Sequence, residues 1–227
     1  MRLPSGDYLI LSCEHGGNRL PAPFRHLFTK GFLSTHRGYD PGALTLARDF
    51  AAVTGAPLFY STVTRLLVEL NRPLGHPQVF SKTLPPEVRD ELLQEYYFPY
   101  WRRVEAAVRR ASRRVLHISF HSFTPELRGE RRTTDVGLLF DPARPPEAAF
   151  CRRWRLALQA NNPRLQVRYN NPYAGTHPSL VDSLREKFAP TRYVGIQIEV
   201  NQKFPRGDAR RWRALCRLLV ESFQSIR

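Results

Sequence analysis

Residues 8–17 read YLILSCEHGG, an apolar run that changes abruptly into charged and glycine-rich sequence. The apolar part, 8–13, has the length and composition of a buried strand. Glu14 and His15, followed by two glycines, mark the carboxyl end of that strand. The stretch therefore predicts a central strand that delivers a histidine to one edge of a sheet.

Strand-like and helix-like segments alternate along the rest of the chain. Strands are predicted at 57–61, 115–120, 135–140, 165–169 and 193–200, and a further extended segment at 65–70. Helices are predicted at 40–54, with Gly55 past the end, at 85–114 with a kink or break at Pro99, at 146–161, at 178–188 and from Asp208 onward. This order predicts a layered α/β fold around a mixed, largely parallel sheet. No linker or repeat divides residues 1–227, so one domain is expected, with the polar segment 126–134 as an exposed loop or lid.

The composition narrows the class of protein. The chain of 227 residues is 42% hydrophobic, which excludes a disordered polymer, and no apolar run approaches the roughly 18 residues needed to span a bilayer. A net charge of +15 suggests nucleic-acid binding, but only four of the 35 basic residues are Lys and the arginines are dispersed. Three scattered cysteines argue against a disulfide framework. We therefore expect a soluble, cytoplasmic protein that binds neither membrane nor nucleic acid.

Reactive side chains stand at the ends of three predicted strands. His15 follows the first strand, His121 follows the run 115–120, and Glu199 lies in the apolar run 193–200. Because the carboxyl ends of parallel strands meet at one sheet edge, these side chains are expected to lie close together. Two histidines and carboxylates are the parts of a zinc hydrolase, in which a further carboxylate can act as general base. The alternative is that each is a hydrogen-bonded structural residue.

A second group of residues suits an anionic ligand. The sequence TRLLVELNR places Arg65, Asn71 and Arg72 around an apolar run, and arginine can grip a carboxylate with two parallel hydrogen bonds. The alternative is an edge strand with surface arginines. Cys13 shares a strand face with His15, as a thiol nucleophile and its base would, but its apolar surroundings favour a buried structural thiol.

Seven short motifs follow one another along the chain. They are CEHGGNRLP at 13–21, YDPGA at 39–43, RLLVELNR at 65–72, YYFPY at 96–100, HSF at 121–123, NPY at 171–173 and QIE at 197–199. In this order they resemble the N-formylglutamate amidohydrolase (N-formylglutamate deformylase) family, and the resemblance spans about residues 8–225. Two features depart from it: Glu69 stands where the family usually has Asp, and the EHGGN sequence is closer to a shorter branch of the family.

The resemblance implies a zinc-dependent amide hydrolase with a three-layer αβα fold. This fold is zinc-carboxypeptidase-like (phosphorylase/hydrolase-like) and similar to that of aspartoacylase. Carried over to this sequence, the resemblance implies a Zn²⁺ ion on His15 and His121. The third ligand is either Asp40 or Asn18, and Asp40 is preferred because an ionised carboxylate binds zinc far better than a neutral amide.

The same resemblance implies roles for the remaining residues. Glu199 is expected to be the general base. Arg72, with Asn71, Arg65 and Tyr173, is expected to bind the carboxylate of a small anionic N-acyl amino acid such as N-formylglutamate. Two alternatives stay open at this point: a zinc carboxypeptidase or deacylase with a different N-acyl substrate, and an arginine-rich nucleic-acid-binding protein without catalysis.

Overall fold

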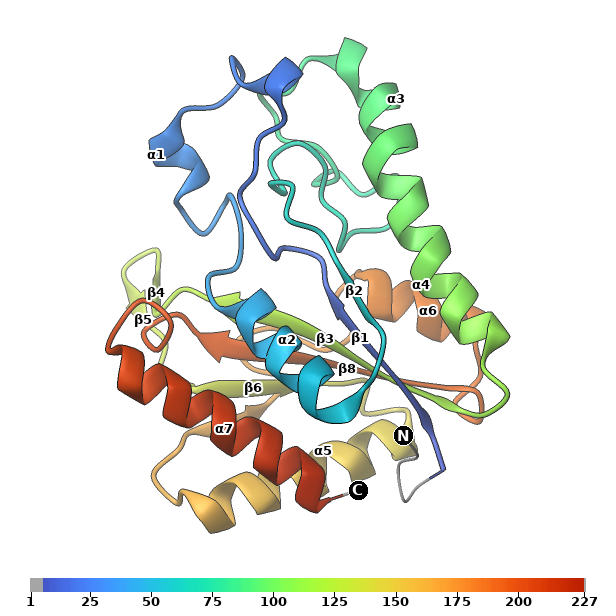
Figure 1. The fold of residues 1–227 in the computed structure, drawn as a ribbon, viewed down its shortest axis with the longest axis vertical. Coiled ribbons are helices and arrows are strands. Elements are labelled where there is room, and N and C mark those ends of the chain that lie inside the picture. The colour runs from blue at the N-terminus through green and yellow to red at the C-terminus, as the bar shows by residue number, and fades with distance from the viewer. Residues whose placement is uncertain (1–5, 227) are drawn as a thin grey trace.

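A computed structural model describes residues 6–226 (Figure 1). Its strands are β1 (Tyr8–Cys13), β2 (Leu58–Tyr60), β3 (Val115–Phe123), β4 (Glu126–Leu127), β5 (Glu130–Arg131), β6 (Val136–Leu139), β7 (Val167–Tyr169) and β8 (Tyr193–Asn201). Its α-helices are α1 (Lys30–Leu33), α2 (Ala43–Thr54), α3 (Arg89–Leu92), α4 (Phe98–Arg110), α5 (Pro145–Asn161), α6 (Leu180–Lys187) and α7 (Ala209–Ser225). Short 3₁₀ turns lie at Ala22–Phe24 and Pro86–Val88, and a π-helical turn lies at Leu93–Tyr97. The predicted alternation of strands and helices is confirmed.

The central sheet has six strands in the order β2-β1-β3-β8-β6-β7. All neighbouring pairs are parallel except β6 and β8, which run antiparallel, so the predicted mixed and largely parallel sheet is confirmed. The β3–β8 register places His121 opposite Glu199. Two residues predicted to carry chemistry therefore lie side by side at one end of the two central strands.

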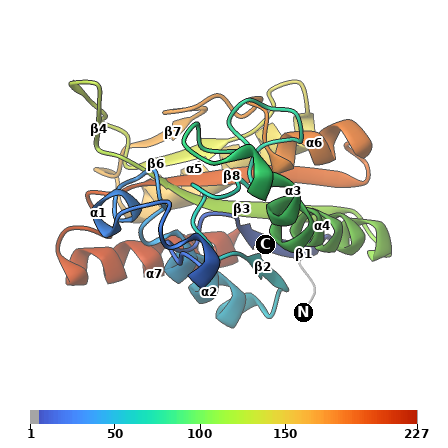
Figure 2. The same cartoon turned by 90° about the horizontal axis from the view of Figure 1, so that it is seen from above.

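Helices cover both faces of the sheet and make three αβα layers. One apolar cluster joins the sheet to α2, α5 and α7 through Phe50, Trp154 and Phe223. A second cluster joins the opposite face to α4 and α6. Figure 2 shows α2 and α7 on one side of β3 and β8, with α6 on the other. Because both faces are covered, the central strands are buried along their whole length, as near-continuous apolar runs require.

Two properties of the whole chain were expected from composition and length. None of the helices among residues 6–226 is both long and apolar enough to cross a bilayer. That residues 1–227 form one domain stays a prediction.

Two predicted helix boundaries need correction. The helix expected from Asp40-Pro41 begins only at Ala43, because Gly42 adopts a left-handed conformation with φ of 81° and turns the chain just before the helix. The helix expected to reach residue 114 ends at Arg110. The helix is not broken at Pro99: a π-helical turn at Leu93–Tyr97 joins α3 directly to α4, and Pro99 lies in the first turn of α4, where a missing N–H is tolerated.

The extended segment predicted at 65–70 is wrong. Residues 65–67 form a turn, and the Arg65 amide donates to the Gly38 carbonyl outside any sheet ladder. The apolar residues that suggested a strand are nevertheless buried, and Leu67 lies in the cluster next to α4. The polar segment 126–134 also differs from a plain loop, since it contains the β4–β5 hairpin.

A buried ion-pair cluster connects α5 to α6 and is expected to stabilise the fold. The Glu147 carboxylate accepts hydrogen bonds from Arg185 Nε at 3.1 Å and from the Gly195 amide at 3.1 Å, and it lies 3.3 Å from Arg144 Nε. Replacing Glu147 by Ala leaves the buried Arg144 guanidinium without its carboxylate and leaves the buried Arg185 only the longer contact with Asp182, at 3.6 Å. We expect the free energy of unfolding, measured by urea denaturation, to fall by about 3–5 kcal/mol. A loss below about 1 kcal/mol would contradict this role, since exposed ion pairs contribute no more than that.

Candidate active site

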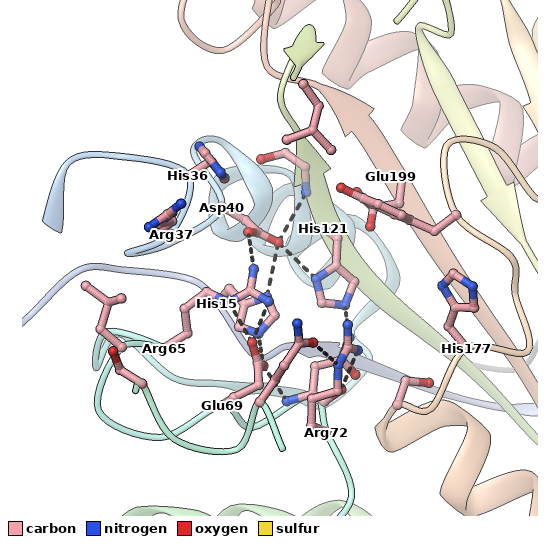
Figure 3. Close-up of a pocket in the computed structure, with 18 of the residues that line it drawn as sticks. His15, His36, Arg37, Asp40, Arg65, Glu69, Arg72, His121, His177 and Glu199 are labelled. Carbon is pink, nitrogen blue, oxygen red and sulfur yellow. Dashed lines mark hydrogen bonds and ion pairs between the residues drawn. The ribbon is translucent and has the colours of Figure 1, made fainter. Parts of the chain in front are cut away.

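Three segments distant in sequence bring His15, Asp40 and His121 together (Figure 3). Asp40 Oδ2 lies 3.2 Å from His15 Nδ1 and 3.0 Å from His121 Nδ1. One potential ligand atom from each residue falls within 4.8 Å of the others, and all three side chains are buried. The strand ends therefore deliver the two histidines as the sequence predicted, and the turn before α2 adds the carboxylate.

The two candidates for the third ligand have different surroundings. The Asp40 carboxylate faces both imidazole rings, and its backbone amide donates to the His15 carbonyl at 3.0 Å, which fixes the turn against β1. Asn18 instead donates from Nδ2 to the Leu33 carbonyl at 3.3 Å and does not line the cavity that His15, Asp40 and His121 line. The geometry of the described residues thus supports Asp40 as the third ligand.

Each histidine presents its second nitrogen to a carboxylate. His15 Nε2 contacts Glu69 Oε1, and His121 Nε2 lies 3.2 Å from Glu14 Oε2 and 2.9 Å from Ser119 Oγ. A carboxylate on one ring nitrogen holds that N–H and leaves the lone pair of the other nitrogen free for a metal. Both Nδ1 atoms are therefore oriented toward the space next to Asp40.

The two supporting carboxylates are held in different ways. Glu14 is fully buried, with hydrogen bonds from Tyr100 Oη at 2.9 Å and Ser119 Oγ at 2.7 Å. Burial alone would raise the pKa of Glu14, but the hydrogen bond with His121 and the nearby hydroxyl donors lower this pKa to about 2. Glu69 is buried too, and the charge of Arg65 outweighs the burial and lowers the pKa of Glu69 below its usual value. Both groups are ionised at neutral pH.

Arg65 is occupied by carboxylates of the protein itself. Its Nε donates to Glu69 Oε2 at 2.6 Å, and its Nη1 donates to Asp40 Oδ1 at 3.4 Å. Arg65 therefore connects Asp40, a candidate metal ligand, with Glu69, the carboxylate that contacts the candidate ligand His15. This geometry gives it a positioning role beside the substrate-binding role expected from the sequence.

Asn71 and Arg72 line the same cavity, and the Asn71 backbone amide donates to Glu69 Oε1 at 2.8 Å. Asn71 is buried, with Nδ2 3.2 Å from His121 Nε2 and with Oδ1 accepting from the Leu180 amide at 3.1 Å. Arg72 donates from Nη1 to the Pro178 carbonyl at 2.9 Å and has no acidic partner among the described residues. Its guanidinium is thus fixed in place by backbone oxygens while its charge is not neutralised.

Glu199 faces this cavity from β8. Its Oε2 is buried and has no hydrogen-bond partner, and burial raises the pKa of the carboxyl to about 7. Gly137 lies opposite Glu199 on β6, and a Cβ there would overlap the Asn171 carbonyl oxygen and approach Glu199 Cβ to 3.3 Å. Only glycine at this position lets the 171–173 loop lie this close to β6, beside Glu199. An unpartnered buried carboxylate beside two histidines is typical of a functional group.

The cavity has a volume of about 800 Å³ and contains all of the predicted site residues except Asn18. Tyr173 lines it from the loop between β7 and α6, and its hydroxyl accepts a hydrogen bond from Arg132 Nη1 at 3.1 Å. Cys13 does not line the cavity, and burial raises the pKa of its thiol well above the usual value. The alternative of a thiol nucleophile therefore has no support in the geometry.

The three central residues fit a metal ion. Two imidazole nitrogens and one carboxylate oxygen are the donor types that zinc takes in catalytic sites, where a fourth position is left for water or substrate. The carboxylates behind both histidines are the supporting contacts that such ligands need. The donor set thus suits zinc, and the ligand atoms already converge.

The sequence interpretation did not identify Glu14 and Glu69 as functional residues. Both were visible as charged residues within otherwise apolar stretches, a placement that is costly unless the charge is paired or used. Their partners lie far away in sequence, His121 for Glu14 and His15 for Glu69, so no local pattern could identify the pairing.

Comparison with known proteins gives one family and several similar folds. A family model described as N-formylglutamate amidohydrolase matches residues 8–204. The crystal structure of a gene product from Agrobacterium tumefaciens is similar, with 26% sequence identity, a TM-score of 0.77, and coverage of 97% of this chain and 92% of that chain. No curated protein matches the sequence.

Two further solved structures are similar only loosely. A bacteriophage poly-gamma-glutamate hydrolase is 12% identical, with a TM-score of 0.48 and coverage of 96% of this chain and 84% of that chain. A metallo-carboxypeptidase from Burkholderia cenocepacia is 11% identical, with a TM-score of 0.42 and coverage of 99% and 59%, respectively. Similarities this loose carry no argument about the site.

Proposed function

Because the chain belongs to the N-formylglutamate amidohydrolase family and is an amidohydrolase, we propose that it hydrolyses N-formylglutamate or a closely related small N-acyl amino acid at a zinc ion. One observation carries the proposal: the buried convergence of His15, Asp40 and His121 in the cavity that also holds the unpartnered oxygen of Glu199. In this reaction water adds to the acyl carbon and the C–N bond breaks. The products are formate and glutamate.

In the proposed reaction Glu199 moves the proton. Zinc, when bound, supplies a Lewis acid that polarises a carbonyl group and makes water more acidic. Glu199 Oε2, free of protein partners, accepts a proton from the attacking water and returns it to the leaving nitrogen. Asp40 and the two histidines are kept in place by Arg65, Glu69 and Glu14 throughout.

Arg72 is proposed to anchor the α-carboxylate of the substrate. Its guanidinium is held at the cavity wall by the Asn71 and Pro178 carbonyls, at 3.1 Å and 2.9 Å, and has no acidic partner among residues 6–226. An arginine fixed in this way is already ordered before the substrate arrives, so little conformational entropy is lost on binding. The buried Asn71 supports this wall through its bond from the Leu180 amide.

Replacing Arg72 by Ala tests the anchor. Loss of a hydrogen bond to a charged group costs about 1.5–3 kcal/mol, so KM for N-formylglutamate is expected to rise roughly 10- to 150-fold with a smaller change in kcat. Steady-state kinetics of formate release measures both. Arg110→Ala is the matched control, because Arg110 is exposed and lies outside the cavity. An unchanged KM in the Arg72 variant would remove the anchor role.

A substrate panel tests the proposed function as a whole. N-formyl, N-acetyl and N-succinyl amino acids are compared with short peptides, using enzyme whose zinc content has been measured by elemental analysis. Release of formate from N-formylglutamate by zinc-loaded enzyme, lost on chelation and restored by zinc, is the expected result. Preference for another acyl group would favour a deacylase, and cleavage of peptides alone would favour a carboxypeptidase.

A further inference from the structure

The cavity is lined by cationic side chains to which the proposed reaction assigns no role. Arg65 is paired with Glu69 and Asp40, and Arg72 is assigned to one carboxylate. Three further cations line the cavity without an ion pair to an acidic residue in the described part of the chain: Arg37, Lys82 and Arg128. N-formylglutamate, on which the proposed function rests, has two carboxylates. A partner for the side-chain carboxylate is therefore needed, and these cations are the candidates.

Arg128 is distinguished from the other two by its backbone. Leu127 pairs with Glu130, so Arg128 and Gly129 form the two-residue loop of the β4–β5 hairpin. Both have positive φ, 54° and 81°, as in the type I′ turns that join hairpin strands. Asn, Asp and Gly are favoured at such positions, whereas a long side chain without a local hydrogen bond is costly there. A residue held in this conformation within a cavity points to a function for its side chain.

The base of the hairpin is fixed to the wall of the same cavity. The Arg132 amide donates to the Pro125 carbonyl at 2.8 Å, which closes the hairpin. The Arg132 side chain donates to the Tyr173 hydroxyl at 3.1 Å, and its guanidinium carbon lies 5.1 Å from the centre of the Tyr173 ring. Because Tyr173 lines the cavity, this clamp fixes the hairpin, and with it Arg128, relative to the site.

We propose that Arg128 binds the side-chain carboxylate of the substrate and sets the preference for an acidic N-formyl amino acid. Arg72 and Arg128 reach the cavity from different segments, one from the loop that follows β2 and the other from the hairpin tip. Two separate cations suit a substrate with two separate carboxylates. All three cations are exposed; the Arg37 guanidinium lies over the Phe32 ring, at 5.7 Å from its centre, and Arg37 and Lys82 add attraction at longer range.

Exchange of the substrate carboxylate for a carboxamide tests this inference. The ratio of kcat/KM for N-formylglutamate to that for N-formylglutamine is measured in the wild-type enzyme and in Arg128→Asn. Asn is favoured in the left-handed region and creates an Asn-Gly turn, so the hairpin is retained and the melting temperature is not expected to fall. The ratio is expected to fall about tenfold or more, because the charge-assisted contact is made only by the carboxylate.

Two controls separate a specific contact from a general loss of charge. Arg131→Gln removes the same charge from the same hairpin, but Arg131 does not line the cavity, so the substrate ratio is expected to be kept. Lys82→Gln tests the competing cation and is expected to change the ratio less than Arg128→Asn does. An unchanged ratio in Arg128→Asn, or an equal fall in either control, would overturn the inference.

The outcome also distinguishes this inference from the proposed function. Wild-type enzyme that hydrolyses both N-formyl substrates, with a ratio that Arg128→Asn does not change, refutes only the role of Arg128. Zinc-loaded wild-type enzyme that releases formate from neither substrate refutes the proposed function, and the assignment of Arg128 then falls with it.

Discussion

Replacing Glu199 by Gln is expected to lower kcat by about 10²–10⁴-fold, the contribution of a positioned general base. Glu199 Oε2 is buried in the cavity and has no hydrogen-bond partner, so the carboxylate is available for a proton of water. The amide has nearly the same shape but cannot accept that proton. Formate release under substrate saturation measures kcat, and elemental analysis measures zinc, which is expected to stay at about one ion per chain.

The zinc measurement makes this result specific. Glu199 is outside the His15, Asp40 and His121 cluster, so the variant should keep its metal. Glu186→Gln is the matched control, since it makes the same change at an exposed position of α6 and should leave kcat unchanged. Near-normal turnover in Glu199→Gln would show that another group is the base. Loss of zinc together with activity would show instead that Glu199 supports the metal.

The strands that carry the site could be predicted because their sequences are constrained in two ways at once. The first constraint is burial: β1, β3 and β8 are covered on both faces, which requires apolar sequences. The second is that charged or ionisable residues stand at or near the ends of these strands, where an apolar run would otherwise exclude them. The segment 65–70 satisfies the first constraint but forms no strand. Its leucines fill the cluster next to α4 from a turn, and apolar content indicates burial without specifying backbone conformation.

The sequence indicated which residues belong to the candidate site better than it indicated which of them contact one another. The residue types singled out His15 and His121, whose side chains converge with Asp40 in the structure, because zinc chemistry restricts the donors that can serve. For Arg65 the sequence identified a carboxylate-binding group but could not specify which carboxylate it binds. In the structure it pairs with Glu69, four residues along the chain, and with Asp40, 25 residues away, whereas Arg72 of the same segment has no ion pair to an acidic residue among residues 6–226. The pairing with Asp40 depends on a tertiary contact that local spacing does not reveal.

The largest loss of metal is expected from Asp40→Asn. The change keeps the shape of the side chain but replaces an anionic donor, 3.2 Å from His15 Nδ1 and 3.0 Å from His121 Nδ1, with a neutral amide. Loss of an outer partner of a ligand already costs about 10- to 100-fold in metal affinity, so loss of a charged ligand is expected to cost more than about 100-fold. Zinc affinity is measured by competition with a chromogenic chelator, and kcat/KM at limiting zinc is expected to fall in parallel.

Asn18→Ala provides the comparison that decides between the two candidate ligands. The Asn18 side chain donates to the Leu33 carbonyl at 3.3 Å and does not line the cavity, so its loss should leave zinc affinity within about twofold of wild type. Circular dichroism establishes that both variants are folded. If Asn18→Ala lost zinc while Asp40→Asn retained it, the ligand set would be His15, Asn18 and His121, and Asp40 would act only as the acceptor that orients the two imidazole rings.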